Sequence, residues 1–380
     1  MPSEGSIKLL NLNATAQTWK LITVLPNLPL NRTWEFEPFA FVPSTDDRLA
    51  AIRESSTAAQ ALLDNFKDAF GRKREPAALI VRDDAITAIP WNNIVDLRNA
   101  FAISCICNAW QKTIGSKNAW SLLYSDYFDF YPFVMHRDGI GLIHLGFGLS
   151  SYDNADDFSG QPHPDLPSGG WNFHAIPDDG LLKVLIERWR KRIQLKRRSW
   201  QSEALFRSLA VAFRAARLPK GSDNQLFDLG IQLSLWVSAH ECLVHPGKKG
   251  KADFREVLSL LGKRHWLYAS LRRKTRLLGQ TRQTPPLNYV QKLYFRLHRA
   301  RNAFLHGNPV KSDLMFIGKT HSDSLFVKAA PLIYQTALES TLVKQRRRRF
   351  RDKREAVVFI FRHAHLERAL TTTRKRRDQP

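Results

Sequence analysis

The stretch Leu287-Asn-Tyr-Val-Gln-Lys-Leu-Tyr-Phe-Arg-Leu-His-Arg-Ala-Arg-Asn-Ala-Phe-Leu-His306 decides the fold of the second half of the chain. Its apolar residues recur at steps of four, three and four, at Leu293, Leu297, Ala300 and Phe304. This spacing is typical of one face of an α-helix. We therefore expect an amphipathic helix over 287–306 whose apolar stripe faces a core.

The end of this helix carries the residues with the most distinctive chemistry. Gly307 permits the left-handed conformation that ends many helices, so His306 is expected in the last turn. Successive residues are rotated by about 100° around the helix axis. Asn302 therefore lies about 40° from His306 around the helix, and Arg301 lies about 140° from His306. An arginine can bind phosphate oxygens while an imidazole moves protons, and RNA supplies its own 2′-hydroxyl nucleophile. The segment therefore predicts phosphodiester chemistry on RNA.

Amphipathic patterns continue on both sides of this helix. They cover residues 181–195, 202–217, 224–244, 254–261 and 329–342. Together they predict an all-α domain over residues 179–345. Beyond it, two runs of basic residues, 346–349 and 374–377, flank the apolar stretch 356–361. Like charges within a run repel each other, so residues 346–380 are expected to form a basic tail, in the middle of which one strand or helix could be ordered.

The first half, residues 1–178, mixes two kinds of pattern and predicts an α+β domain. Strand-like runs occupy residues 19–24, 78–81 and 128–134. Helical patterns cover residues 58–70 and 92–110, and both are expected to pack on a sheet. Residues 150–170 are rich in Ser, Asp, Gly and Pro and predict a linker or long loop.

Composition limits the partners and the compartment. The formal charge of +23 and the pI of about 10.2 favour a polyanion such as nucleic acid, although a generally basic surface is the alternative. The 3 cysteines are too few for a disulfide scaffold or a four-ligand zinc site, so no metal site is predicted. No signal peptide or membrane span is recognisable, which predicts a cytoplasmic protein without a membrane partner.

The order Arg301-Asn302-x-x-x-His306-Gly307 at a helix end resembles the signature of HEPN domains, most closely the Apea-like branch. An earlier helix of that branch carries an acidic residue among apolar ones, which Ala239-His-Glu241-Cys-Leu243 resembles. The resemblance covers about residues 200–345. In a chain with 12 His, an Arg followed by His five positions later is expected about once by chance. The resemblance therefore depends on Asn302, on Gly307 and on the position of the motif at the end of a helix.

This resemblance implies a metal-independent ribonuclease without a cofactor, built as a helical bundle. Two protomers would pair and bring their Arg and His residues into a shared cleft. Arg301, Asn302 and His306 would be the catalytic positions, while Glu241 could orient Arg301 or be an ordinary surface carboxylate. Many relatives act in prokaryotic anti-phage defence or as toxins that cut cellular RNA, often transfer RNA, with a separate N-terminal sensor domain. Residues 1–178 would then be the sensor.

A second group of basic residues could hold RNA phosphates: Arg272, Arg273, Lys274, Arg276 and Arg299. A solvated surface is the alternative interpretation of the same residues. Two other functions also stay open for the helical domain. It could be a non-catalytic nucleic-acid-binding or dimerisation module of HEPN shape, or an effector that acts through contacts with another protein.

Overall fold

The computed structural model describes residues 18–85, 89–113, 123–136, 139–146, 149–162, 174–195, 198–218, 225–247, 250–276, 285–307, 312–317, 326–346 and 366–372. The chain forms two compact units. One combines Met1–Pro26, Arg32–Ala88 and Phe130–Gln161, and the other combines Asn27–Asn31, Ile89–Asp129 and Pro162–Pro380. The first is α+β and the second is helical, which confirms the predicted order of classes. The division differs from the expected boundary at residue 178, because residues 89–129 belong to the helical unit.

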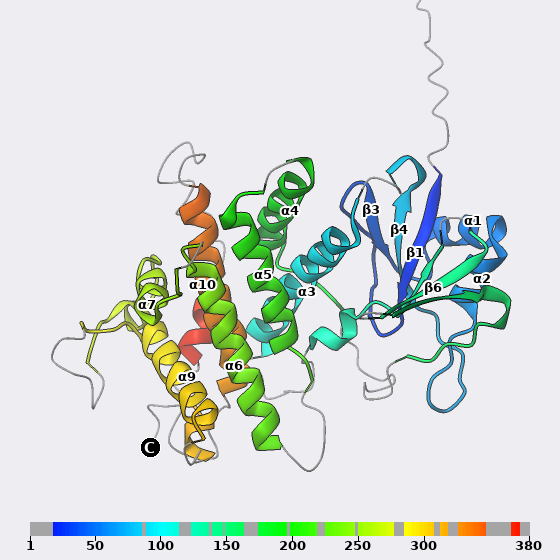
Figure 1. The fold of residues 1–380 in the computed structure, drawn as a ribbon. Coiled ribbons are helices and arrows are strands. Elements are labelled where there is room, and N and C mark those ends of the chain that lie inside the picture. The colour runs from blue at the N-terminus through cyan, green and yellow to red at the C-terminus, as the bar shows by residue number, and fades with distance from the viewer. Residues whose placement is uncertain are drawn as a thin grey trace, which may run out of the picture. The chain divides into compact units, whose positions relative to one another are not determined.

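The N-terminal unit is built on an antiparallel sheet with the strand order β2-β3-β4-β1-β5-β6-β7 (Figure 1). The strands are β1 (Trp19–Leu25), β2 (Trp34–Glu35), β3 (Phe39–Val42), β4 (Ala77–Arg82), β5 (Phe133–Met135), β6 (Gly141–Gly146) and β7 (Leu149–Asn154). The central strands β3 and β4 are almost entirely apolar and buried. Burial on both faces explains why these runs show no alternation of polar and apolar residues.

Two short helices, α1 (Asp47–Ser55) and α2 (Thr57–Asp64), pack on this sheet. Ser56 ends α1 and caps α2 by accepting a hydrogen bond from the backbone of Ala59. The predicted helix over residues 58–70 is therefore too long. It ends at Asp64 because Phe66 leaves the helix and buries its ring against other aromatic rings, including Tyr131 at 4.7 Å.

Two further predictions for this part of the chain are wrong. Only the end of the predicted strand over 128–134 is extended, in β5, because Ser125–Phe128 forms a 3-10 turn, η2. The predicted loop over 150–170 begins as strand β7, which pairs with β6 throughout its length. A strand at the edge of a sheet can expose Ser and Asp side chains to solvent, so these residues did not exclude it. Residues 163–173 lie outside the described part.

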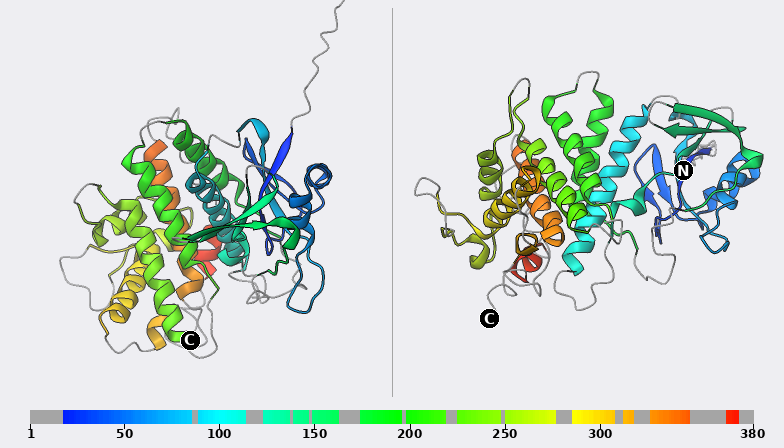
Figure 2. Two further views of the ribbon diagram at one scale, coloured as in Figure 1. Left: turned by 45° about the vertical axis from the view of Figure 1, so that its right-hand side comes forward. Right: turned by 60° about the horizontal axis from the view of Figure 1, so that its bottom comes forward.

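The helical unit contains the helices predicted from the periodicity and one short helix, Ala269–Arg272, that was not predicted (Figures 1 and 2). They are α3 (Trp91–Thr113), α4 (Asp179–Gln194), α5 (Trp200–Ala215), α6 (Gln225–Val244), α7 (Phe254–Gly262), α8 (Ala269–Arg272), α9 (Tyr289–Leu305) and α10 (Phe326–Arg346). Side-chain caps fix the beginnings of four of them, at Asp178, Ser199, Asp253 and Asn288. None of the described helices combines the length and the apolar composition needed to cross a bilayer.

Helix α3 belongs to the helical unit, whereas residues 92–110 were expected to pack on the sheet of the first half. It packs against α4, α5 and α10. Polar contacts hold it there: Arg192 of α4 lies 2.9 Å from the carboxylate of Asp96, and the Trp189 indole donates to the Asn93 carbonyl. Residues are buried around most of its circumference, so its hydrophobic pattern alone does not reveal which neighbours cover it.

Helix α10 is the most deeply buried element of the helical unit. Residues 331–343 are all buried, including the polar Gln335 and Glu339. The Gln335 amide accepts a bond of 2.6 Å from Gln111 of α3 and donates one of 2.8 Å to Glu339. The Glu339 carboxylate also pairs with Arg264, whose side chain is likewise fully buried. This chain of polar contacts ties α10 to α3 and to the segment after α7.

Part of the expected basic tail packs into the helical unit. Residues 366–372 are helical, and Leu366, Glu367, Ala369 and Leu370 are buried. The Glu367 carboxylate accepts hydrogen bonds from the backbone N–H groups of Leu267 and Tyr268. The tail therefore contains an ordered element, as the sequence allowed, and these seven residues are held to the helical unit by their apolar face and by the Glu367 carboxylate. Residues 347–365 and 373–380 lie outside the described part.

Breaking the buried pair between Arg264 and Glu339 should destabilise the helical unit. We expect Arg264→Leu or Glu339→Leu to lower the free energy of unfolding by about 3–5 kcal/mol, because each leaves a buried charge without its partner. The double variant should lose less than the sum of the two. Urea denaturation followed by circular dichroism measures this. Arg272→Leu, at an exposed position, is the control and should change stability by less than about 0.5 kcal/mol; single variants as stable as this control would contradict the prediction.

Candidate functional site

Helix α9 has well-defined ends, which set the positions of the motif residues. Asn288 and Gln291 form a capping box at its beginning. His306 is the C-cap, and Gly307 has a φ of 67°, as expected for a left-handed helix end. Arg301 and Asn302 thus lie in the last full turn, with His306 immediately after it.

The apolar stripe of α9 anchors this turn. Leu293, Leu297 and Ala300 are fully buried, as predicted, whereas Phe304 is half-buried. The Phe304 ring lies directly over Gly230 of α6, and its centroid is 5.1 Å from that of the Phe227 ring. A Cβ atom on Gly230 would lie 2.3 Å from the Phe304 ring, so only glycine allows this approach of α9 to α6.

Arg301 forms an ion pair with Glu241 of α6. The distance between Arg301 Nη2 and Glu241 Oε1 is 2.5 Å, and the two side chains are 19% and 25% exposed. Burial raises the pKa of Glu241, while the charge of Arg301 and its hydrogen bond oppose this rise. Two roles were left open for Glu241, and this geometry favours the one in which Glu241 orients Arg301 over that of an ordinary surface carboxylate. The Nε of Arg301 is buried and has no hydrogen-bond partner among the described residues, so the guanidinium keeps a donor unused.

His298 is a member of this cluster that the motif does not contain. Its Nε2 lies 4.0 Å from Glu241 Oε1, and its Nδ1 lies 3.4 Å from Asn302 Nδ2. An amide NH₂ group can only donate, so His298 Nδ1 accepts this bond and the ring carries its proton on Nε2. Burial, and secondly the charge of Arg301, lower the pKa of His298 to about 4. The imidazole is therefore neutral at physiological pH.

This contact orients Asn302. Because Nδ2 of Asn302 is directed to His298, the carbonyl oxygen of the same amide is directed away from that ring. Asn302 thus offers an acceptor to anything that binds beside Arg301. The half-buried Phe254 of α7 covers His298, with ring centroids 4.5 Å apart, and limits the conformations of the imidazole.

Tyr294 lies one turn before His298 on the same face, with a distance of 6.2 Å between the rings. Its hydroxyl is buried and has no hydrogen-bond partner among the described residues. Burial and the nearby charge of Glu241 raise its pKa, so the phenol stays protonated. The Tyr294 hydroxyl and Arg301 Nε are two of several buried donors without a partner among the described residues, and both residues lie near Glu241.

His306 is not drawn into this cluster. It is exposed at the C-cap of α9, where its backbone N–H donates to the Asn302 carbonyl, and its imidazole makes no hydrogen bond or ion pair with a described residue. The structure thus joins Arg301 to Glu241, and Asn302 to His298, while His306 stays accessible at the helix end.

The predicted RNA-binding residues fall into two places. All five are exposed. Arg299 is on α9, two residues from Arg301. The others flank Thr275, which pairs through its backbone with Leu287 just before α9 begins. At 1.5 Å per residue, that end of α9 lies roughly 20 Å from Arg301. The 272–276 segment is therefore remote from the site. Arg299 lies about 160° from Arg301 around α9 and about 60° from Asn302, so it is nearer to Asn302 than to the ion pair.

His298 and Tyr294 were missed in the sequence, although a signal exists. Tyr294, His298, Asn302 and His306 recur every four residues and form a polar stripe beside the apolar one.

No group of His, Cys, Asp or Glu among the described residues has the arrangement of a metal site. Comparison of the chain with family models, with curated proteins and with solved structures yields no match.

The environment of His298 can be measured directly. In ¹⁵N NMR titrations we expect a neutral Nε2–H ring at neutral pH and a pKa of about 4. Arg301→Leu should raise this pKa, because it removes a neighbouring positive charge, but not to the ordinary value of about 6.5, since burial is the larger cause. His298→Gln identifies the signal. A ring protonated at pH 6, or a proton on Nδ1, would contradict the assignment.

Proposed function

We propose that this chain is a metal-independent endoribonuclease of the HEPN type. The observation that carries the proposal is the half-buried Arg301, held by Glu241 beside Asn302 and one turn from the exposed His306. The resemblance to HEPN domains depends on the order of these residues at the end of a helix. The unit around them is helical, as a HEPN domain would be. The +23 charge favours a polyanionic substrate.

The chemistry assigned to each residue follows from its surroundings. Glu241 occupies Nη2 of Arg301 and Nε is buried, which leaves the second amino group, Nη1, for phosphate oxygens. The 2′-oxygen attacks the neighbouring phosphorus, the P–O2′ bond forms, and the P–O5′ bond breaks to leave a cyclic phosphate. The amide oxygen of Asn302 can accept a hydrogen bond from the attacking hydroxyl.

His306 is the imidazole best placed for proton transfer. The low pKa of about 4 keeps His298 from donating a proton at neutral pH, and its Nε2–H faces Glu241. His298 therefore positions Asn302, whereas the exposed His306 can take the proton from the 2′-hydroxyl and return one to the 5′-oxygen.

An exposed apolar patch beside the site supports the paired arrangement of protomers. It comprises Phe227 and Ile231 of α6 and Leu305 of α9, which are 55%, 43% and 56% exposed. Phe227 contacts Phe304, the neighbour of Leu305, so the patch adjoins the last turn of α9. Large apolar side chains grouped on a surface mark association sites. A second copy placed there brings a second Arg301 and His306 to the same region.

The remaining assignments rest on the resemblance. The N-terminal α+β unit would sense a trigger, and the cell would be prokaryotic, with the nuclease acting in the cytoplasm in anti-phage defence or as a toxin. Transfer RNA is the first substrate to test. The rival is a non-catalytic nucleic-acid-binding or dimerisation module, in which Arg301 binds phosphate without cleavage.

Cleavage of total RNA and of transfer RNA in excess EDTA tests the proposal. Wild type should produce fragments ending in cyclic phosphate, detectable by mass spectrometry. Arg301→Ala and His306→Ala should each reduce the rate by about 10²–10⁴-fold, because they remove charge stabilisation or proton transfer.

Arg255→Ala and His265→Ala, both at exposed positions outside the site, are the matched controls and should cleave at the wild-type rate. Loss of cleavage in EDTA, or equal rates in all variants, would refute the proposal. RNA binding without cleavage by wild type would favour the rival module.

Association through the apolar patch can be tested separately. Ile231→Glu should raise the dissociation constant of the dimer by tenfold or more, because a carboxylate would be buried or repel its symmetry copy. Sedimentation velocity measures this, and Leu195→Glu, exposed on α4's C-cap, is the control. A wild type that stays monomeric at every concentration, or an unchanged dimer in Ile231→Glu, would exclude this interface.

A further inference from the structure

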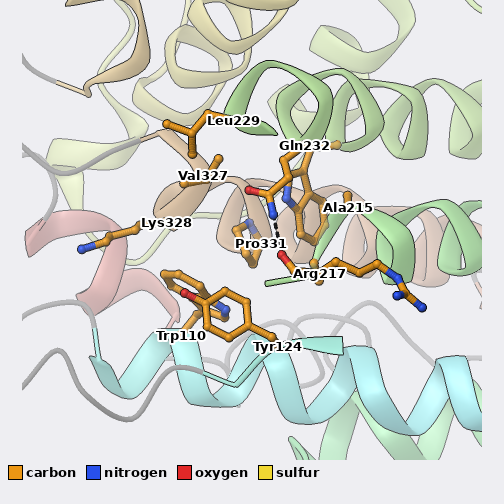
Figure 3. A pocket seen from close by; sticks show the side chains of 11 residues that line it. Trp110, Tyr124, Ala215, Arg217, Leu229, Gln232, Val327, Lys328 and Pro331 are labelled. Carbon is orange, nitrogen blue, oxygen red and sulfur yellow. Dashed lines mark hydrogen bonds between the residues drawn. The ribbon is translucent and has the colours of Figure 1, made fainter. Parts of the chain in front are cut away.

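The helical unit contains a pocket on the side of α6 away from Glu241. It has a volume of about 100 Å³ and lies between α3, α5, α6 and α10 (Figure 3). Its walls are mainly apolar and include Trp110, Tyr124, Leu229, Trp236, Val327 and Pro331. Trp236 and Glu241 are five residues apart on α6, which places them about 140° apart around the helix.

Flat aromatic surfaces dominate these walls. The rings of Trp110 and Tyr124 meet edge to face, with centroids 6.2 Å apart. Trp236 is fixed by burial and by contact with Tyr334, at 5.5 Å between centroids. Pro331 contributes its rigid ring from α10 (Figure 3). Rigid, flat walls of this kind favour a flat apolar occupant through dispersion and stacking.

The charges near the pocket are directed elsewhere. Figure 3 shows the guanidinium of Arg217 and the ammonium of Lys328 extending away from the centre of the pocket. The Arg217 guanidinium pairs with Asp129 at 2.9 Å and with the buried Asp126 at 3.4 Å. Burial raises the pKa of Tyr124 to about 12, so its hydroxyl is neutral. The interior therefore offers no net charge to an ionic ligand.

Hydrogen-bond acceptors remain in the pocket. The Gln232 amide nitrogen donates to the Arg217 carbonyl, and Figure 3 shows the amide oxygen directed to the other side, toward Val327. Because Pro331 has no N–H, the carbonyl of Val327 cannot receive its usual bond within α10. An occupant with one donor group can satisfy an acceptor of this kind, which otherwise costs free energy when covered by an apolar ring.

We propose that this pocket binds a neutral, planar aromatic molecule that carries one N–H or O–H donor. An apolar cavity of roughly 150 Å³ is enough to hold benzene. A pocket of about 100 Å³ that opens to the surface accommodates part of a bicyclic ring such as an indole, with the rest of the molecule at the opening. The site is independent of the proposed nuclease function.

Calorimetric titration of the full chain with indole tests the proposal. Indole should bind with one site per chain, and 1-methylindole, which lacks the donor, should bind at least about tenfold more weakly because it leaves an acceptor unsatisfied. Indole-3-carboxylate, which is negatively charged, should also bind at least about tenfold more weakly. Equal affinity for the three ligands would overturn the assignment of a neutral ring with a donor.

Two variants locate the binding. Leu229→Trp and Val327→Phe fill the pocket from α6 and from α10, and each should weaken indole binding at least about tenfold. Leu195→Trp places the same large ring at an exposed position outside the pocket and the apolar patch and should leave binding unchanged. Thermal melting identifies any variant that fails to fold. If one of the two pocket-filling variants does not fold, indole binding to the other variant tests the location of the site. Absence of saturable binding to wild type, or wild-type affinity in a folded filled variant, would overturn the proposal.

Discussion

The helical unit depends on the burial of α10 on all sides. A helix in that position must find partners for its polar side chains, because an unpaired buried amide or carboxylate costs several kcal/mol. Gln335 and Glu339 meet this requirement through Gln111 and Arg264. These bonds require α3 and the segment after α7 to take particular positions around α10. The apolar residues of α10 supply most of the burial, and the polar chain selects the arrangement.

The candidate site is a consequence of this packing. Both α6 and α9 contact α10 and each other. With Gly230 allowing Phe304 to approach α6, the Arg301 side chain from the last turn of α9 reaches Glu241 in the last turn of α6. The same approach leaves the phenol of Tyr294 and Nε of Arg301 buried without partners among the described residues. Within the described part of the chain, unpaired buried donors also occur in the core, at Nε and Nη2 of Arg264, so they do not by themselves distinguish the cluster. What distinguishes it is that the half-buried Arg301 and Asn302 lie beside the exposed His306.

Much of the helical half could be predicted, because its signals are local. The signals for each helix lie within a few residues of the feature that they determine. Examples are the periodicity of α9, its end at Gly307, and the hydrogen bond that the Asp178 side chain accepts from an N–H group in the first turn of α4. The first half was harder. The expected loop over 150–170 contains β7, since an edge strand tolerates the polar residues that usually indicate a loop. Helix α3 was expected on the sheet because its pattern does not identify its neighbours.

The sequence by itself determined that Arg301, Asn302 and His306 occupy one helix end, because helical geometry relates residues only a few positions apart. Only the tertiary structure decided that Arg301 meets Glu241, since these residues are 60 positions apart and their contact depends on how α6 crosses α9. It also decided that Phe254 covers His298 and that His298 turns the amide of Asn302. Burial sets the protonation of that imidazole, and burial is a property of the packed molecule.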